Sequence, residues 1–114
     1  HCAGSTRYYI GHVVGNTDNV RNRDSEFSER RELTAAELTA ILDIAISEAD
    51  QVLTHFDPSR LLERTSRTPK LTTLMNVLEF QLAHYSTHTG QILFATKLLQ
   101  SDAIDDLWRN TPSR

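Results

Sequence analysis

Two histidines lie four residues apart in the segment "LAHYSTHTGQI", residues 82–92. If this segment is helical, the side chains of His84 and His88 lie on one face, about 5 to 6 Å apart. Two imidazole nitrogens at that spacing can bind one ion, each at about 2.0 to 2.1 Å. Neutral imidazole is a ligand for zinc, nickel, copper and ferrous iron. The pair therefore indicates a metal site that needs at least one further ligand.

The same pair also has a purely structural interpretation. On an ideal helical wheel, His84 and His88 fall inside the apolar stripe of their helix, with Gln81 and Gln91 close by. A buried imidazole without a partner costs about 1 to 3 kcal/mol, so hydrogen bonds to glutamine, tyrosine or backbone carbonyls would equally explain the pair. The glutamate of the "HExxH" zinc-protease motif is absent, and no general base of that kind is predicted.

A third ligand has several candidates, namely His1, His12, His55, Cys2 and the acidic residues of the connector that follows the first helix. His1 and His12 are about 16 Å apart along one predicted helix, so they cannot bind the same ion. His55 precedes Asp57-Pro58 at a helix end, where an imidazole commonly caps carbonyl groups. Burial as a small apolar residue is the simplest role for Cys2. The residues alone leave the choice of third ligand open.

The elements that must position these histidines are helices. A capping box of Thr34 and Glu37 opens a helix that runs to about Phe56, where Asp57-Pro58 ends it. Its predicted buried stripe consists of Leu38, Ile41, Leu42, Ala45, Ala49, Val52, Leu53 and Phe56.

A second long helix starts near Thr72 or Thr73 and runs to about Gln100, a length of roughly 40 Å. Gly90 is a position at which it could bend. Its predicted buried stripe consists of Leu74, Val77, Phe80, Tyr85, Ile92, Ala95, Leu98 and Leu99. Residues 1–14 form a shorter helix ended by Gly15-Asn16, and a charged connector follows. No segment reads as a strand, which predicts an all-α bundle with antiparallel neighbours.

Composition limits the classes of function. The 114 residues fit a single domain, 1–114, with 39% hydrophobic and 24% charged residues. The net charge of −3 provides no basic face, which argues against a nucleic-acid partner. No segment reaches the roughly 20 apolar residues of a membrane span, and no signal peptide opens the chain. A single cysteine forms no internal disulfide, which suits a cytoplasmic protein.

Three segments, "HCAGSTRYYIGHVVGN", "RNRDSEF" and "HYSTHTGQILFATKLL", resemble the DinB-like proteins (DinB/YfiT type), and "HTGQI" is the most specific of these matches. The resemblance covers nearly the whole chain. It implies an up-and-down helical bundle that binds a divalent metal ion, most often zinc or nickel, through three histidines. Carried over by position, these metal ligands are His1, His84 and His88.

One departure from the DinB-like pattern concerns the start of the chain. Family members have a complete helix and a connector before the histidine that matches His1. The first bundle helix is therefore expected to be absent here, leaving three main helices with an exposed apolar groove. Such a groove predicts self-association, with a homodimer as the simplest form.

Three histidines on a divalent ion leave one coordination position open, as in catalytic zinc sites. Water or a thiol at that position becomes a nucleophile at neutral pH. The resemblance implies a thiol S-transferase or a hydrolase, with a small-molecule substrate or a low-molecular-weight thiol as partner. Gln81, Gln91 and Tyr85 are candidates to accept the remaining imidazole N–H bonds, or they simply cap buried groups.

The segment "RNRDSEF" also has two interpretations. Arg21, Arg23, Asp24 or Glu26 could line the mouth of the site and hold an anion or supply a base. A run of charges is more often a solvated loop, and that interpretation is preferred.

Two classes of function stay open. One is a metal-dependent enzyme with an accessible coordination position. The other is a non-catalytic metal-binding or stress-related bundle, whose ion is enclosed by a fourth protein ligand such as Cys2 or a carboxylate.

Overall fold

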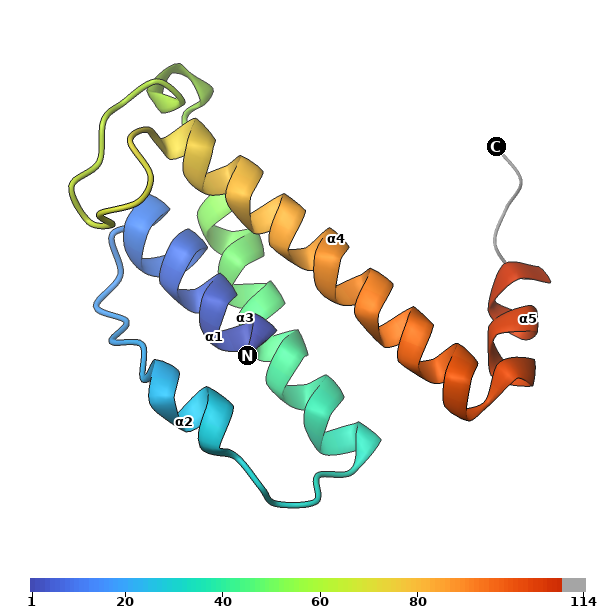
Figure 1. The fold of residues 1–114 in the computed structure, drawn as a ribbon. Coiled ribbons are helices and arrows are strands. Elements are labelled where there is room, and N and C mark those ends of the chain that lie inside the picture. Colours follow the sequence, from blue (N-terminus) through green and yellow to red (C-terminus); the bar gives the residue numbers. More distant parts are fainter. Residues whose placement is uncertain (110–114) are drawn as a thin grey trace. The chain divides into compact units, whose positions relative to one another are not determined.

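The computed structural model describes residues 1–109, so the last five residues of the predicted domain lie outside the described part. Its elements are α1 (Cys2–Thr6), η1 (Arg7–Val14), α2 (Arg23–Ser28), α3 (Ala35–Thr54), η2 (Pro58–Arg60), α4 (Leu74–Leu99) and α5 (Ser101–Arg109) (Figure 1). Within the described residues, the only β pairing is an isolated bridge between Arg64 and Thr73. The predicted all-α helical bundle is confirmed.

Contacts divide the chain into two compact units, which are described separately. The first is His1–Leu82 and the second begins at Ala83. The boundary falls within α4, which is a single continuous helix over Leu74–Leu99. The predicted long helix is thus confirmed to within two residues at each end. Within the described residues, no helix is long and apolar enough to cross a membrane.

The first predicted helix, residues 1–14, is present as α1 followed directly by η1, which has π-helical hydrogen bonding. It ends as predicted, because Asn16 adopts a left-handed backbone conformation with φ of 60°. A Cβ atom at Gly15 would lie 2.6 Å from Cγ2 of Val52. Glycine at this position therefore allows the end of η1 to approach α3 closely.

Helix α3 begins with the predicted capping box. Thr34 Oγ1 accepts a hydrogen bond from the Glu37 amide at 3.2 Å, and the Glu37 carboxylate accepts one from the Thr34 amide at 2.8 Å. The pKa of Glu37 lies below its usual value because of the backbone and side-chain hydrogen bonds from Thr34. The helix extends to Thr54, and His55 is its C-cap.

The buried stripe predicted for α3 is only partly correct. Ala45 and Ala49 are buried, and Val52 and Phe56 are half-buried against the core. The remaining predicted members are exposed, namely Leu38, Ile41, Leu42 and Leu53. The reason is that α3 contacts α1 and η1 through a narrow face of small residues. The larger side chains lie on the flanks of that face.

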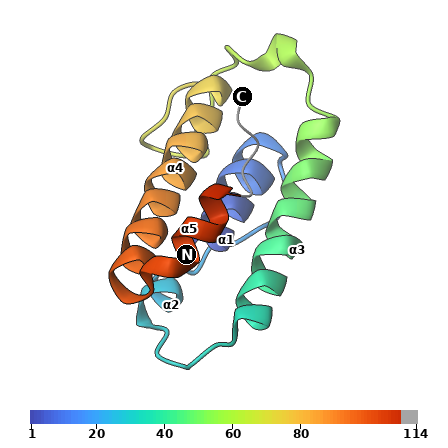
Figure 2. The same ribbon diagram turned by 90° about the vertical axis from the view of Figure 1, so that its right-hand side faces the viewer.

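The core of the first unit lies where η1 meets the start of α4. It consists of Val13, Val14, Leu74 and Val77, with Tyr8, Tyr9, Val52, Phe56, Leu71 and Leu78 packed around it. Figures 1 and 2 show α1 and η1 beside both α3 and the first turns of α4.

Helices α1 and η1 run antiparallel to the first turns of α4. Val14 shares the core with Leu74, and the ring centroids of Tyr9 and Phe80 are 4.8 Å apart. As residue numbers fall along the first helix, they therefore rise along α4.

In the second unit, α5 follows the end of α4 directly, and Ile104 is its buried residue at 6% exposure. The apolar stripe predicted for α4 holds at Leu74 and Val77 but is wrong for Ile92, Leu98 and Leu99, which are 63 to 87% exposed. Periodicity identified an amphipathic helix here, but burial also requires a neighbour along its whole length.

Candidate metal centre

His84 and His88 come together on one face of α4, as their spacing predicted. Their Nε2 atoms are 3.0 Å apart, and the ring centroids lie 4.5 Å apart with the planes nearly perpendicular. Both residues are half-buried. Two nitrogens that share an ion at metal–nitrogen distances of 2.0 to 2.1 Å lie about 2.8 to 3.4 Å apart. The pair therefore fits two ligands of one ion, and the same distance also fits a hydrogen bond between the rings.

His1 is the N-cap residue of α1 and belongs to the first unit. Its side chain is 21% exposed, and Nδ1 lies 2.9 Å from Oε2 of Glu26. The ring also packs against Phe27, with centroids 4.7 Å apart. Arg21 also places a terminal nitrogen 3.3 Å from Nδ1, but the carboxylate oxygen is nearer. A carboxylate only accepts hydrogen bonds, so in the closer contact Nδ1 carries the proton and Nε2 of the neutral ring keeps its lone pair. The ring nitrogen that faces away from Glu26 is thus the one able to bind a cation.

Arg21 holds the Glu26 carboxylate in place with two hydrogen bonds. Nε donates to Oε1 at 2.7 Å and a terminal nitrogen donates to Oε2 at 2.6 Å. The side chains are 10% and 12% exposed. Hydrogen bonding to Glu26 raises the pKa of Arg21 above its usual value, against the opposing effect of burial. The pair is therefore a fixed, charged clamp next to His1.

The preferred interpretation of "RNRDSEF" as a solvated loop is wrong for Arg21 and Glu26. Most of this segment is helix α2, with Asn22 as N-cap accepting a hydrogen bond from the Ser25 amide at 3.1 Å. The sequence contained a local signal for this helix, because asparagine is a favoured N-cap residue whose side chain accepts a hydrogen bond from a backbone amide of the first turn. Nothing in the sequence showed that this short helix would lie against residue 1.

The other two histidines have structural roles. The Nδ1 atom of His55 lies 2.8 Å from the Gln51 carbonyl oxygen, which confirms the predicted cap. His12 makes the equivalent contact with the Thr17 carbonyl at 2.7 Å, and its ring stacks on Tyr8. His55 thus binds a carbonyl in the last turn of α3, whereas His12 binds a carbonyl of the segment that follows η1.

Gln81, one of the residues expected near the histidines, forms a buried link to α1. Its Nε2 donates to Thr6 Oγ1 at 2.9 Å, and its Oε1 accepts from Ser5 Oγ at 3.1 Å. All three residues are at most 5% exposed. Of the other two candidates, Gln91 is exposed and Tyr85 is half-buried.

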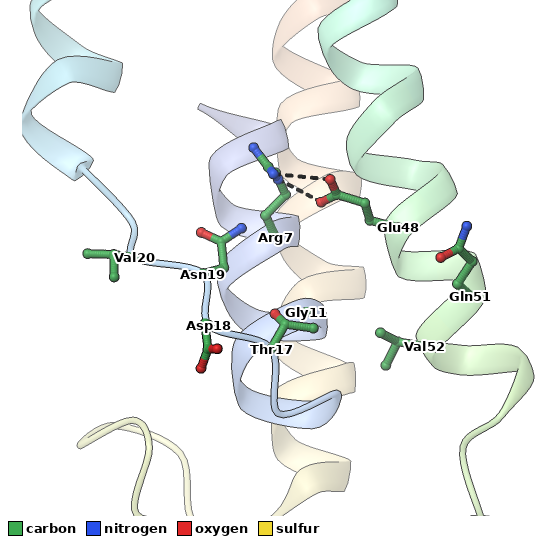
Figure 3. Close-up of a pocket in the computed structure, with 9 residues that line it drawn as sticks. All are labelled: Arg7, Gly11, Thr17, Asp18, Asn19, Val20, Glu48, Gln51 and Val52. Atoms are coloured by element: carbon green, nitrogen blue, oxygen red, sulfur yellow. Dashed lines mark hydrogen bonds and ion pairs between the residues drawn. The ribbon is translucent and has the colours of Figure 1, made fainter.

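A hollow of about 680 Å³ in the first unit is lined by none of the histidines. It lies between η1, the segment 17–20 and α3, beside the ion pair of Arg7 and Glu48 (Figure 3). A smaller hollow of about 180 Å³ is lined in part by Gly4, Arg21 and Glu26. This hollow borders the clamp of Arg21 and Glu26.

A model of one protein family matches residues 9–109, a range that includes His84 and His88 and begins after His1. The family is described as "Protein of unknown function (DUF1572)". No curated protein and no solved structure matches the chain. Because the match covers most of the sequence, the chain belongs to the DUF1572 family of proteins of unknown function.

Proposed function

We propose that this chain is a DinB-like metal-binding protein in which His1, His84 and His88 bind one divalent ion, zinc or nickel. Each residue offers one imidazole nitrogen, which is a ligand that both zinc and nickel take from proteins. The observation that carries the proposal is the hydrogen-bonded link of Gln81 to Ser5 and Thr6.

This link aligns α1 with the first turns of α4 along their axes. His1 is about 6 Å along the axis of α1 from Ser5, at 1.5 Å per residue. Counted from Gln81, His84 and His88 are about 4.5 and 10.5 Å along α4. Because α1 and the first turns of α4 run antiparallel, both steps lead in the same direction, and their lengths are compatible with the proposed sharing of one ion.

The angular positions of His84 and His88 around the axis of α4 support the same arrangement. At 100° per residue, His84 and His88 lie within about 60° of Gln81 around the helix axis. Gln81 directs its amide at α1. The histidine pair thus continues the face of α4 that Gln81 occupies.

Three neutral nitrogen ligands suit zinc and nickel and leave a coordination position open. A bound divalent ion supplies Lewis acidity, which makes water or a thiol a stronger nucleophile at neutral pH. The residues of this chain hold the ion and orient the imidazoles. On this basis we propose a thiol S-transferase or hydrolase that acts on a small molecule, with a non-catalytic metal-binding bundle as the alternative.

Metal titration tests the site itself. The protein is prepared with a short extension before His1, so that the terminal amino group does not compete as a ligand. Zinc or nickel is then titrated into metal-free protein, and bound metal is measured by elemental analysis. We expect one ion per chain and a higher melting temperature, with about 2.7 kcal/mol of added stability when free metal is 100 times Kd.

Single substitutions identify the ligands. His1→Ala, His84→Ala and His88→Ala should each weaken binding strongly. His12→Ala and His55→Ala are matched controls, because these imidazoles bind backbone carbonyls. One bound ion that survives both His84→Ala and His88→Ala would contradict the proposal.

A conjugation assay with a low-molecular-weight thiol and an electrophile separates the two classes of function. An enzyme should lose activity in the His88→Ala variant together with its metal. Wild-type protein that binds one ion, gains stability from it and shows no turnover would favour the non-catalytic bundle.

A further inference from the structure

We propose that Glu26 is a positioning residue for the metal site, which sets the tautomer and orientation of the His1 ring through Nδ1. This inference rests on the proposed function. Its direct basis is the 2.9 Å contact between His1 Nδ1 and Glu26 Oε2, in which both side chains are largely buried.

The contact decides which His1 nitrogen can bind a cation. Free histidine exchanges its proton between Nδ1 and Nε2, so an unrestrained ring presents each nitrogen part of the time. With Nδ1–H donating to the carboxylate, Nε2 is the unprotonated nitrogen of the neutral ring. A negative partner on Nδ1–H also increases the basicity of Nε2, and partners of this kind typically change metal affinity by about 10- to 100-fold.

Three features keep the Glu26 carboxylate in this position. Arg21 binds both oxygens, which prevents the group from rotating away. Phe27, the next residue of α2, packs against the face of the His1 ring. The third feature is the absence of a side chain at Gly4, where a Cβ atom would lie 2.1 Å from Glu26 Oε1 and 2.7 Å from Cδ. The carboxylate thus occupies space that only glycine leaves free.

Glu26→Gln tests the charge and the tautomer together. A glutamine amide can donate as well as accept, so it no longer selects the Nδ1–H form of His1. Long-range ¹H–¹⁵N spectra of the metal-free protein report the tautomer directly, and a purely structural role for Glu26 would not move them. We expect a shift towards Nε2–H in these spectra and a loss of zinc affinity of about 10- to 100-fold. Glu29→Gln is the matched control, because Glu29 pairs with the exposed Arg31.

Gly4→Ala is a second variant that leaves Glu26 and Arg21 chemically unchanged. The new methyl group meets the end of a side chain rather than backbone, so the carboxylate must move away from its present position, and circular dichroism checks that the variant is folded. We expect the same tautomer shift and a comparable loss of affinity. Gly90→Ala is its control, since a Cβ atom there has no neighbour within 4 Å.

The outcomes separate this inference from the proposed function. Wild-type protein that binds no metal overturns the proposed function and this inference with it. Wild-type protein that binds one ion, while Glu26→Gln and Gly4→Ala bind equally tightly or keep the Nδ1–H tautomer, overturns the inference alone. Weaker binding together with a changed tautomer in both variants supports it.

Discussion

The buried link between Gln81, Ser5 and Thr6 allows a quantitative prediction for the substitution Gln81→Glu. Thr6 Oγ1 lies 3.0 Å from the Cys2 carbonyl oxygen and donates its single hydrogen there. Position 81 must therefore donate to Thr6, as the glutamine Nε2 does at 2.9 Å. An ionised glutamate has no hydrogen to donate, although it can still accept the hydrogen bond from Ser5.

The cost of Gln81→Glu has a lower and an upper limit. The lost hydrogen bond alone is worth about 1 kcal/mol. The cost cannot exceed that of keeping the carboxyl group protonated, which is about 1.36 kcal/mol for each pH unit above the usual glutamate pKa of about 4.3. At pH 7 this limit is about 3.7 kcal/mol. We therefore expect the free energy of unfolding to fall by about 1 to 4 kcal/mol at pH 7.

The pH dependence of this loss follows from the direction of the pKa change. Burial raises the pKa of a glutamate at position 81 in the folded state above its unfolded value. The folded variant then binds more protons than the unfolded one, so its stability relative to wild type falls as pH rises. Near pH 4 the protonated carboxyl group donates to Thr6 again, and the variant should lie within about 0.5 kcal/mol of wild type.

Urea unfolding followed by circular dichroism, with chelator present at pH 7 and pH 4, measures both values. Each variant is compared with wild type at the same pH, because other carboxylates also titrate in this range. Gln81→Met is the control, since it removes both hydrogen bonds without adding a titratable group. Its loss of unfolding free energy relative to wild type should be similar at the two pH values. If Gln81→Glu loses the same amount of unfolding free energy at pH 4 and at pH 7, the predicted dependence on the protonation of residue 81 is refuted.

Three further predictions concern α3. Hydrogen bonds from Thr34 lower the pKa of Glu37 in the folded protein. The ionised Glu37 should therefore stabilise the fold fully at pH values above the unfolded pKa, and this stabilisation should be lost as pH falls through the lower folded pKa. In thermal melts, the stability difference between wild type and Glu37→Gln should vanish at low pH. Thr34→Ala should cost about 0.5 to 2 kcal/mol through loss of the cap, and an unchanged melting temperature would contradict this role. Leu38 and Ile46 of α3 are 54% and 46% exposed, so we propose that a second copy of the chain contacts these two side chains. Sedimentation velocity should then show a concentration-dependent dimer that Leu38→Glu and Ile46→Glu weaken about tenfold or more, whereas a monomer at every concentration would argue against it.

Features that depend on a few neighbouring residues could be predicted from the sequence. The capping box of α3 is one, because Thr34 and Glu37 satisfy each other's backbone groups within one turn. The pairing of His84 with His88 is another, since helical geometry alone brings residues four apart onto one face. The cap at His55 likewise needs only the carbonyl one turn earlier.

Tertiary structure decided which distant groups meet. Glu26 reaches His1 across a separation of 25 residues, and Gln81 reaches Ser5 across 76. Helical periodicity marked an apolar face on α3 and on α4, but it could not show that Ala45 and Ala49 would be covered while Leu38 and Leu42 stayed exposed. Local hydrogen bonds and helix geometry are properties of adjacent residues, whereas burial and long-range pairing depend on which surfaces of the folded chain come into contact.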